Sequence, residues 1–254
     1  MSTLIMKANS RLIALSCIIM LMVCAPGLQA QNTPPAKIAF DYIIMQSVNN
    51  KETGTASYTN YYFTKDGKYA AISGNTGNSG VSLIIYERDK PAWIVDDKEH
   101  TITAYTMPMI FGGMGAMMGG GGSRRSKISV RASGQAKKIC GLPAVCYTAT
   151  GADSTKVNFW YVQLNFDPSL LYTLGTGSFM GKEMNGKKLG INDNSPMSVV
   201  LKNRNYFLAE VSDGNQKAIE TTKISASGFV FLSSGYEVRD MSNKGIGEIL
   251  RNKH

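Results

Sequence analysis

The stretch TASYTNYYFTKDGKYAAIS, residues 55–73, decides the fold class. Thr, Tyr, Phe and Ile recur on both sides of Lys65-Asp66-Gly67-Lys68, and such residues favour β-strands. Asp-Gly between two runs of this kind is a strong signal of a tight hairpin turn. The stretch therefore predicts two antiparallel strands that are joined by a turn at residues 65–68.

The same signals recur along most of the chain. Further strand-like runs cover residues 37–48, 81–89, 91–107 (with a turn at Asp96–Glu99), 127–133, 155–165, 197–203, 206–213, 217–225 and 228–240. Helical signals are few, and the clearest is Asp167-Pro168, which suits the start of a short helix over residues 167–175. Many short strands with few helices predict a mainly β domain whose sheet curls or closes.

The N-terminus has the pattern of a secretory signal peptide. Lys7 and Arg11 precede an apolar run over residues 12–23, and small and turn-forming residues follow. The run is shorter than the roughly 20 apolar residues that span a membrane. We therefore expect residues 1–30 to be a signal peptide that is cleaved after Ala30.

Lipidation at Cys24 is the alternative, since a lipoprotein signal also places a cysteine after its apolar core. Such signals usually have Gly, Ala or Ser before the cysteine, and here Val23 precedes it. With cleavage after Ala30, residues 31–36 form a linker, and the protein is expected in the periplasm, at the outer membrane or outside the cell. Residues 37–240 then form one domain, and residues 241–254 form a tail or a short helix.

The charge of the chain is basic but dispersed. The formal net charge is +9, and removal of Lys7 and Arg11 with the signal peptide leaves 25 basic and 18 acidic residues, or 25 − 18 = +7. The lysines are scattered, with no basic block that alternates with aromatic residues. This distribution indicates a solvated, mildly basic surface, with attraction to anionic lipid or polysaccharide as the alternative. A nucleic-acid partner is not expected for an exported chain.

Residues 107–126, MPMIFGGMGAMMGGGGSRRS, differ in composition from the rest of the chain. They contain five methionines and seven glycines between two predicted strands. Because glycine does not favour one backbone conformation, we expect a flexible loop that interrupts the domain.

Motifs for catalysis and metal binding are not found in the sequence. The chain has two histidines, His100 and His254, and neither lies in a spaced set of metal ligands. A nucleophile elbow and a phosphate-binding loop are also missing from the sequence. The chain is therefore expected not to be an enzyme, with no catalytic residue, metal site or cofactor.

Large aromatic side chains are the candidates for ligand contact. Phe159, Trp160 and Tyr161 are consecutive on one predicted strand, so both faces of that strand carry a ring. We also select aromatic residues on other strands, namely Trp93, Phe229 and Phe231. Such rings are ordinary core residues in most β proteins, and the alternative is an apolar sheet face that holds an acyl chain or a peptide.

Cys140 and Cys146, in the stretch KKICGLPAVCYT (137–148), are the two cysteines that remain after removal of residues 1–30. Paired cysteines of exported proteins usually form disulfides. A redox motif would have only two residues between the cysteines, and a metal site would need further ligands. With Leu142-Pro143-Ala144 as the loop of a hairpin, the two cysteines would face each other, and we expect a disulfide between them.

Several stretches resemble, in the same order, the bacterial envelope proteins that contain the domain of unknown function numbered 4412. These stretches are YERDKPAWIVDDKEHTITAYTM, KKICGLPAVCYTAT, VNFWYV, SPMSVVL and GFVFLSSGYEVRDM, and the resemblance spans roughly residues 37–240. The family is similar in layout to the LolA/LppX-type lipoprotein carriers. The resemblance implies a strongly curved antiparallel sheet, a half-open barrel with a few short helices in its concave face. Ser233 stands where that family often has proline, and no ligand-binding residue carries over.

These observations favour an exported, non-catalytic protein that binds a hydrophobic ligand (lipid, acyl chain or apolar peptide) on a curved β-sheet. The expected partner is a lipid or a lipoprotein. The alternative is an envelope structural or protein-interaction module that binds another envelope protein and no small molecule. The sequence leaves the oligomeric state open.

Overall fold

The computed structural model describes residues 32–49, 54–74, 81–88, 90–105, 130–150, 156–173, 196–214 and 216–242. The chain divides into two compact units, Met1–Asn32 and Thr33–His254, and all elements described below belong to the second unit. The predicted signal peptide, the Met/Gly-rich loop 107–126 and residues 243–254 lie outside the described residues.

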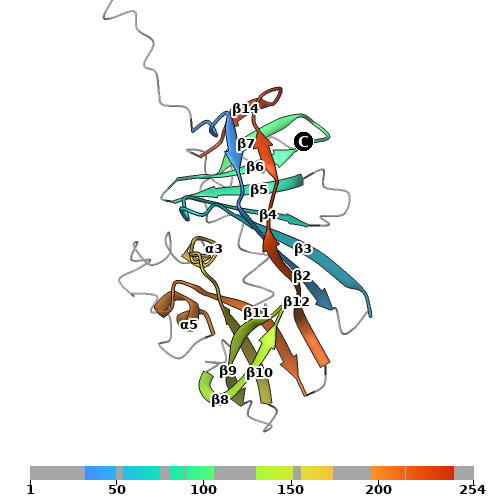
Figure 1. Ribbon diagram of the computed structural model, residues 1–254. Helices are drawn as coiled ribbons and strands as arrows, with labels where there is room; N and C mark the ends of the chain where they lie inside the picture. Colours follow the sequence, from blue (N-terminus) through green and yellow to red (C-terminus); the bar gives the residue numbers. More distant parts are fainter. Residues whose placement is uncertain are drawn as a thin grey trace, which may run out of the picture. The chain divides into compact units, whose positions relative to one another are not determined.

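The described part of the second unit is mainly β with a few short helices (Figure 1). Its helices are α3 (Leu170–Thr173) and α5 (Pro196–Lys202). Its strands are β1 (Lys37–Ala39), β2 (Tyr42–Asn49), β3 (Ala56–Phe63), β4 (Tyr69–Gly74), β5 (Val81–Glu87), β6 (Ala92–Asp96), β7 (Thr101–Tyr105), β8 (Val130–Ile139), β9 (Leu142–Thr150), β10 (Lys156–Gln163), β11 (Tyr206–Asp213), β12 (Gln216–Ala226), β13 (Val230–Leu232) and β14 (Glu237–Asp240).

Twelve of these strands form one large sheet in the order β14-β7-β6-β5-β4-β3-β2-β12-β11-β10-β9-β8. Neighbouring strands are antiparallel except at one edge, where β14 adds in parallel to β7. The sheet is open, with β14 and β8 as its edges, and it is not strongly curled. The expectation of a mainly β fold with few helices is confirmed. The expected strongly curved, half-open barrel is not found, and the expectation of a purely antiparallel sheet is wrong at β14.

The hairpin predicted from residues 55–73 is present. Phe63 on β3 pairs with Ala70 on β4, and the turn at residues 65–68 lies between them. Asp66 stabilises this turn because its Oδ1 accepts a hydrogen bond from the Lys68 backbone N–H at 2.9 Å. Gly67 has a φ of +66°, which glycine adopts without strain. The predicted turn between β6 and β7 is confirmed as well.

Alternation along the central strands gives the sheet two apolar faces. On β3, β4 and β5, one face carries Phe63, Ala70 and Tyr86, whereas the opposite face carries Ala71 and Ile85. The first set belongs to a large buried cluster that includes the residues of α3 and α5, and we call this cluster the helix-side core. The second set belongs to a smaller cluster, which we call the ribbon-side core.

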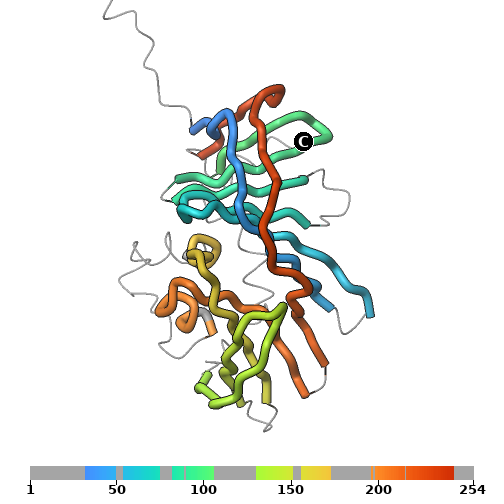
Figure 2. Tube along the Cα trace, in the orientation of Figure 1, coloured from blue at the N-terminus to red at the C-terminus, as the bar shows by residue number. Residues whose placement is uncertain are grey.

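A two-stranded ribbon of β1 and β13 covers the ribbon-side core. Figure 2 shows the two segments running side by side, although they come from opposite ends of the chain. Ile38 and Phe231 pair across the ribbon and point inward, and both are buried. The predicted single strand over residues 37–48 is therefore split into β1 and β2 at Phe40-Asp41.

The strand predicted over residues 197–203 is wrong, because this segment is helix α5. Val199 and Val200 gave the strand signal, but Pro196 is the first residue of the helix, where proline is tolerated. The Asn203 side chain donates a hydrogen bond to the Val199 carbonyl at 2.8 Å and so satisfies one of the last carbonyls of the helix. Both valines are buried in the helix-side core, so packing outweighs the β propensity of their side chains.

Candidate functional site

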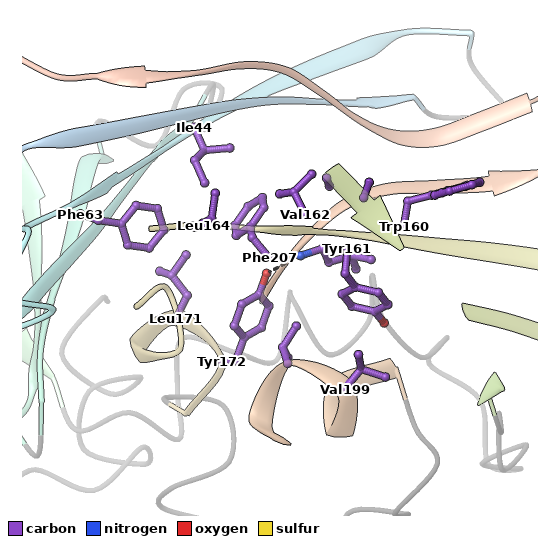
Figure 3. Close-up of a cluster of buried hydrophobic side chains, with 14 of the residues drawn as sticks. Ile44, Phe63, Trp160, Tyr161, Val162, Leu164, Leu171, Tyr172, Val199 and Phe207 are labelled. Atoms are coloured by element: carbon purple, nitrogen blue, oxygen red, sulfur yellow. Dashed lines mark hydrogen bonds between the residues drawn. The ribbon is translucent and has the colours of Figure 1, made fainter. Parts of the chain in front are cut away.

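Two short helices, α3 and α5, pack on the helix-side core. Helix α3 contacts β4 and β5, and α5 contacts β11 and α3. The helices contribute five buried residues to the core, namely Leu170, Leu171, Tyr172, Val199 and Val200. Figure 3 shows Leu171, Tyr172 and Val199 directed toward side chains of the sheet. The helices contain four and seven residues, and helices this short are unstable without tertiary contacts.

Aromatic rings line the part of the core beneath α3. Phe207 on β11 lies among three of them, with centroid distances of 5.6 Å to Tyr61, 6.4 Å to Phe63 and 6.2 Å to Tyr172. A further stacked pair, Tyr42 and Phe166, has its centroids 4.1 Å apart. Edge-to-face and stacked contacts of this kind stabilise aromatic clusters beyond simple burial.

A buried polar network lies at the end of the ladder between β11 and β12, where Leu208 and Ala209 have no partner on β12. Gln46 Nε2 donates to the Leu208 carbonyl at 2.7 Å, and Thr221 Oγ1 donates to the Ala209 carbonyl at 2.8 Å. The Leu208 backbone N–H donates to the Tyr172 hydroxyl oxygen at 3.1 Å, which fixes α3 to β11 (Figure 3). Side chains thus satisfy backbone groups that are not paired in the ladder.

The tyrosine hydroxyls beneath α3 keep their protons. Burial raises the pKa of Tyr61 to about 12, and it also raises the pKa of Tyr86 and of Tyr172. The Tyr61 phenol contributes, after burial, to the raised pKa of both other tyrosines. In the physiological pH range they are neutral hydrogen-bonding groups.

Helix α5 is fixed by a separate tyrosine. The Tyr161 hydroxyl donates a hydrogen bond to the Pro196 carbonyl at 3.0 Å, at the first residue of the helix. Burial raises the pKa of Tyr161 as well, because it disfavours the charged phenolate.

An ion pair on β8 and β11 lies beside Trp160. Lys137 Nζ is 2.6 Å from Glu210 Oε1 and 4.2 Å from the centroid of the Trp160 ring. Lys217 Nζ lies 3.5 Å from the other carboxylate oxygen of Glu210, and only 6% of the Glu210 side chain is exposed. The carboxylate is therefore buried between two lysines.

The aromatic residues predicted to bind a ligand do not form one site. Trp93 and Phe231 are buried in the ribbon-side core, and Phe229 packs against that core. The other three, Phe159, Trp160 and Tyr161, belong to the helix-side core or pack against it. The two groups lie in different cores.

The sequence reading missed the residues beneath α3. Tyr61, Tyr86, Tyr172, Phe207 and Gln46 come from four strands and one helix, and their proximity depends on the pairing of distant segments. One feature of the sequence did point to this site. Tyr61 and Phe63 are two positions apart in the stretch 55–73, so both rings lie on one face of β3.

The predicted disulfide is absent, since Cys140 and Cys146 are free thiols. The turn of the hairpin is Cys140-Gly141, flanked by the pair Ile139 and Leu142, and not Leu142–Ala144 as expected. Cys146 lies four residues beyond Leu142, or roughly 13 Å along the strand. A disulfide requires Cα atoms within about 7 Å, so the register prevents it.

Among the described residues, no group of three or more His, Cys, Asp or Glu side chains could hold a metal ion. In the same part of the chain, no helix is long and apolar enough to cross a membrane.

Comparisons with known proteins leave the family open. No protein-family model and no curated protein matches the chain. Among solved structures, PNGF-II matches 84% of this chain at 10% identity with a TM-score of 0.41, and the chain spans about a third (33%) of PNGF-II. An uncharacterized conserved protein from Thermus thermophilus matches 80% of this chain and 91% of its own at 4% identity, with a TM-score of 0.37.

A LolA superfamily protein from Nitrosomonas europaea matches 77% of this chain and 89% of its own at 8% identity, with a TM-score of 0.25. All three likenesses are too weak to support an argument about fold or function. The resemblance to the family with domain 4412 stays a prediction.

Proposed function

We propose that this protein is an exported, non-catalytic protein that binds a hydrophobic ligand, a lipid or an acyl chain, between the sheet and helices α3 and α5. The observation that carries the proposal is the aromatic face around Phe207, which is covered by two helices of four and seven residues. Export rests on the signal-peptide pattern of residues 1–30.

In this proposal, a ligand reaches the apolar face of the sheet by displacing one of the two short helices. Because they are unstable on their own, their position depends on contacts with the apolar face below them. Each helix also has a polar contact with the sheet: the Tyr172 hydroxyl accepts a hydrogen bond from the Leu208 N–H, and the Tyr161 hydroxyl donates one to the Pro196 carbonyl. A displaced helix would uncover the rings of Phe63 and Phe207, and an acyl chain would replace the lost apolar contacts.

Extraction of the purified protein with organic solvent, followed by mass spectrometry of the extract, tests the proposed function. We expect an acyl compound in the extract, or a stable complex when the delipidated protein is incubated with monopalmitoylglycerol. A protein that yields no acyl compound and forms no complex would contradict the proposal.

A second candidate is an envelope interaction module, and the outer face of the β1–β13 ribbon favours it. Val230 and Leu232 are 41% and 51% exposed there, beside the exposed residues Lys37 and Ala39. Replacement of Val230 and Leu232 with serine separates the two candidate functions. If the variant no longer binds a partner protein but still binds lipid, the interaction module is favoured. If both partner binding and lipid binding are unchanged, the ligand-binding proposal remains in place.

A further inference from the structure

We infer that β8, one edge strand of the large sheet, binds an extended acidic peptide of a partner protein, which pairs as a further strand beside residues 136–139. The inference goes beyond the proposed function, because this edge does not involve the core beneath α3. Three features support it: the charge of the region, the backbone groups that face the free edge, and the position of the cations on both faces of the strand.

The basic residues are dispersed along the chain, but the acidic residues are not. Residues 100–152 contain six basic residues and no Asp or Glu. Without this region, the chain after residue 30 has 25 − 6 = 19 basic and 18 acidic residues, or 19 − 18 = +1. Arg131, Lys137 and Lys138 of the six belong to β8, and the other three lie outside the described residues. The hairpin of β8 and β9 therefore has the charge that attracts an acidic partner.

Backbone groups of β8 face its free edge. Among the described strands, β8 pairs with β9 alone. In an antiparallel pair, alternate residues direct their N–H and C=O toward the partner strand, and the residues between direct them away. Lys138 lies opposite Pro143, which has no N–H, so the two do not form a hydrogen-bonded pair. The backbone groups of Lys138, and those of Ala136 two residues before it, therefore point away from β9, and both residues are exposed.

A β-bulge limits the site to one end of the strand. The register of β8 with β9 shifts between Ala132 and Ala136. Inside the bulge, the Gln135 N–H donates a hydrogen bond to the Ser133 hydroxyl oxygen at 3.2 Å, so this amide is already satisfied. A bulge disrupts the regular ladder locally. A peptide strand can therefore pair with residues 136–139, and it cannot continue the same ladder through the bulge.

The position of the cations favours a peptide over a membrane surface. Arg131 is in register with Thr148, and Lys138 is in register with Pro143. The two partners are five positions apart on β9, so the side chains of Arg131 and Lys138 lie on opposite faces. Neither cation has an ion pair with another described residue. A membrane would meet one face of the strand, whereas an added peptide strand directs its side chains alternately to both faces.

The other edge of the sheet lacks these features. Strand β14 has four residues, and its Arg239 is paired with Glu237 at 2.8 Å. At the end of this strand, Asp240 Oδ1 accepts hydrogen bonds from the Ser242 N–H at 2.9 Å and from the Ser242 hydroxyl at 2.6 Å. An acidic peptide is therefore expected to bind at β8 and not at β14.

Three synthetic peptides test the inference. The probe is a fluorescein-labelled octapeptide of alternating Thr and Glu, and its binding to the purified protein is followed by fluorescence anisotropy. A peptide with Lys in place of Glu should bind at least about tenfold more weakly, because it places like charges together. The acidic peptide with N-methyl groups on its central residues should bind at least about fivefold more weakly, the effect of one net hydrogen bond. Hydrogen exchange at the Ala136 and Lys138 amides should slow when the probe binds.

Variants assign the binding to the edge of β8. Ala136→Pro removes an outward N–H without changing the charge, and it should weaken binding at least about fivefold. Lys138→Gln removes one exposed cation and should weaken binding about two- to fivefold. Lys65→Gln, a change at an exposed lysine in the turn between β3 and β4, is the control and should leave the affinity unchanged. If circular dichroism shows that Ala136→Pro does not fold, the N-methylated peptide tests the same hydrogen bonds.

Three results would overturn the inference. The first is that the acidic probe does not bind, or binds no more tightly than the basic peptide. The second is that the N-methylated peptide binds as well as the probe, which would show attraction of charges without strand pairing. The third is that vesicles of phosphatidylglycerol bind and the probe does not, which would assign the charge to a membrane surface. Each result leaves the proposed ligand beneath α3 to be tested by solvent extraction.

Discussion

Lys137 Nζ lies 2.6 Å from Glu210 Oε1, although two strands separate β8 from β11. The Lys137 ammonium lies over the ring of Trp160, with Nζ 4.2 Å from the ring centroid. One side chain thus covers the tryptophan and neutralises a carboxylate that is only 6% exposed. This contact ties the edge strand of the sheet to its interior.

Lys137→Met keeps most of the apolar stem and removes the charge. We expect a loss of about 1–2 kcal/mol in the free energy of unfolding, less than for a fully unpaired buried charge because Lys217 remains near Glu210. Urea unfolding of Lys137→Met and of the control Lys138→Met, a change at an exposed neighbour, measures this loss. Equal stability of the two variants would show that the ion pair contributes nothing.

Cys140→Asn should stabilise the hairpin of β8 and β9 by up to about 1 kcal/mol. Cys140 and Gly141 have φ values of +49° and +82°, and a two-residue turn with two positive φ angles favours Asn-Gly. The change removes one weak contact, from Cys140 Sγ to the Thr221 carbonyl at 3.5 Å. Thermal unfolding without a reductant measures the effect. A clear loss of stability would contradict this account of the turn.

Tyr172→Phe should destabilise the protein by about 1–2 kcal/mol. The change leaves the Leu208 N–H, which donates to the Tyr172 hydroxyl at 3.1 Å, without this acceptor in the core. The exposed Tyr58 provides the matched control, since Tyr58→Phe removes a hydroxyl that is already in water. Hydrogen exchange at the Leu208 amide should accelerate in Tyr172→Phe alone, and unchanged protection would contradict the role of this bond.

The free energy of unfolding should fall at alkaline pH, because tyrosines with a raised pKa lose their protons there. The hydrogen bond that Tyr236 donates to Asp97 raises the pKa of Tyr236 to about 12, and burial raises the pKa of Tyr61 to about 12. The folded state holds these protons more tightly than the unfolded state, in which tyrosine titrates near pH 10. The stabilisation is therefore complete below about pH 10 and is lost as the pH rises toward about 12.

Urea unfolding over this pH range, together with tyrosinate absorbance, measures the effect. Tyr236→Phe should reduce the slope of stability against pH without removing it, because the buried tyrosines remain. A free energy of unfolding that does not change between about pH 10 and about pH 12 would contradict the raised pKa values.

Local signals in the sequence were sufficient for most strands. The turn at Asp66-Gly67 and the turn between β6 and β7 depend on residues that are adjacent in the chain, and both were predicted correctly. The short helix after Asp167 was also predicted, and Asp167 Oδ1 accepts a hydrogen bond from the Ser169 N–H just before α3.

Interactions between distant segments were not predictable in this way. Helix α5 has a strand-like composition and becomes helical because Val199 and Val200 pack in the core. The parallel addition of β14 to β7 joins residues more than a hundred positions apart. The hairpin of β8 and β9 is present, but its turn begins two residues before the loop that was predicted at Leu142. The prediction missed this position because Cys140 adopts a positive φ, which cysteine rarely does.

Photolabelling of the purified protein with a photoactivatable monoacylglycerol tests whether an acyl chain binds beneath α3. After irradiation, the labelled peptides are identified by tandem mass spectrometry, and an excess of monopalmitoylglycerol serves as the competitor. We expect competed labels on residues 58–63, 166–173 and 206–209, the segments that surround Phe207 beneath α3. Labels confined to the exposed residues Val230 and Leu232, or no competed label at all, would contradict it.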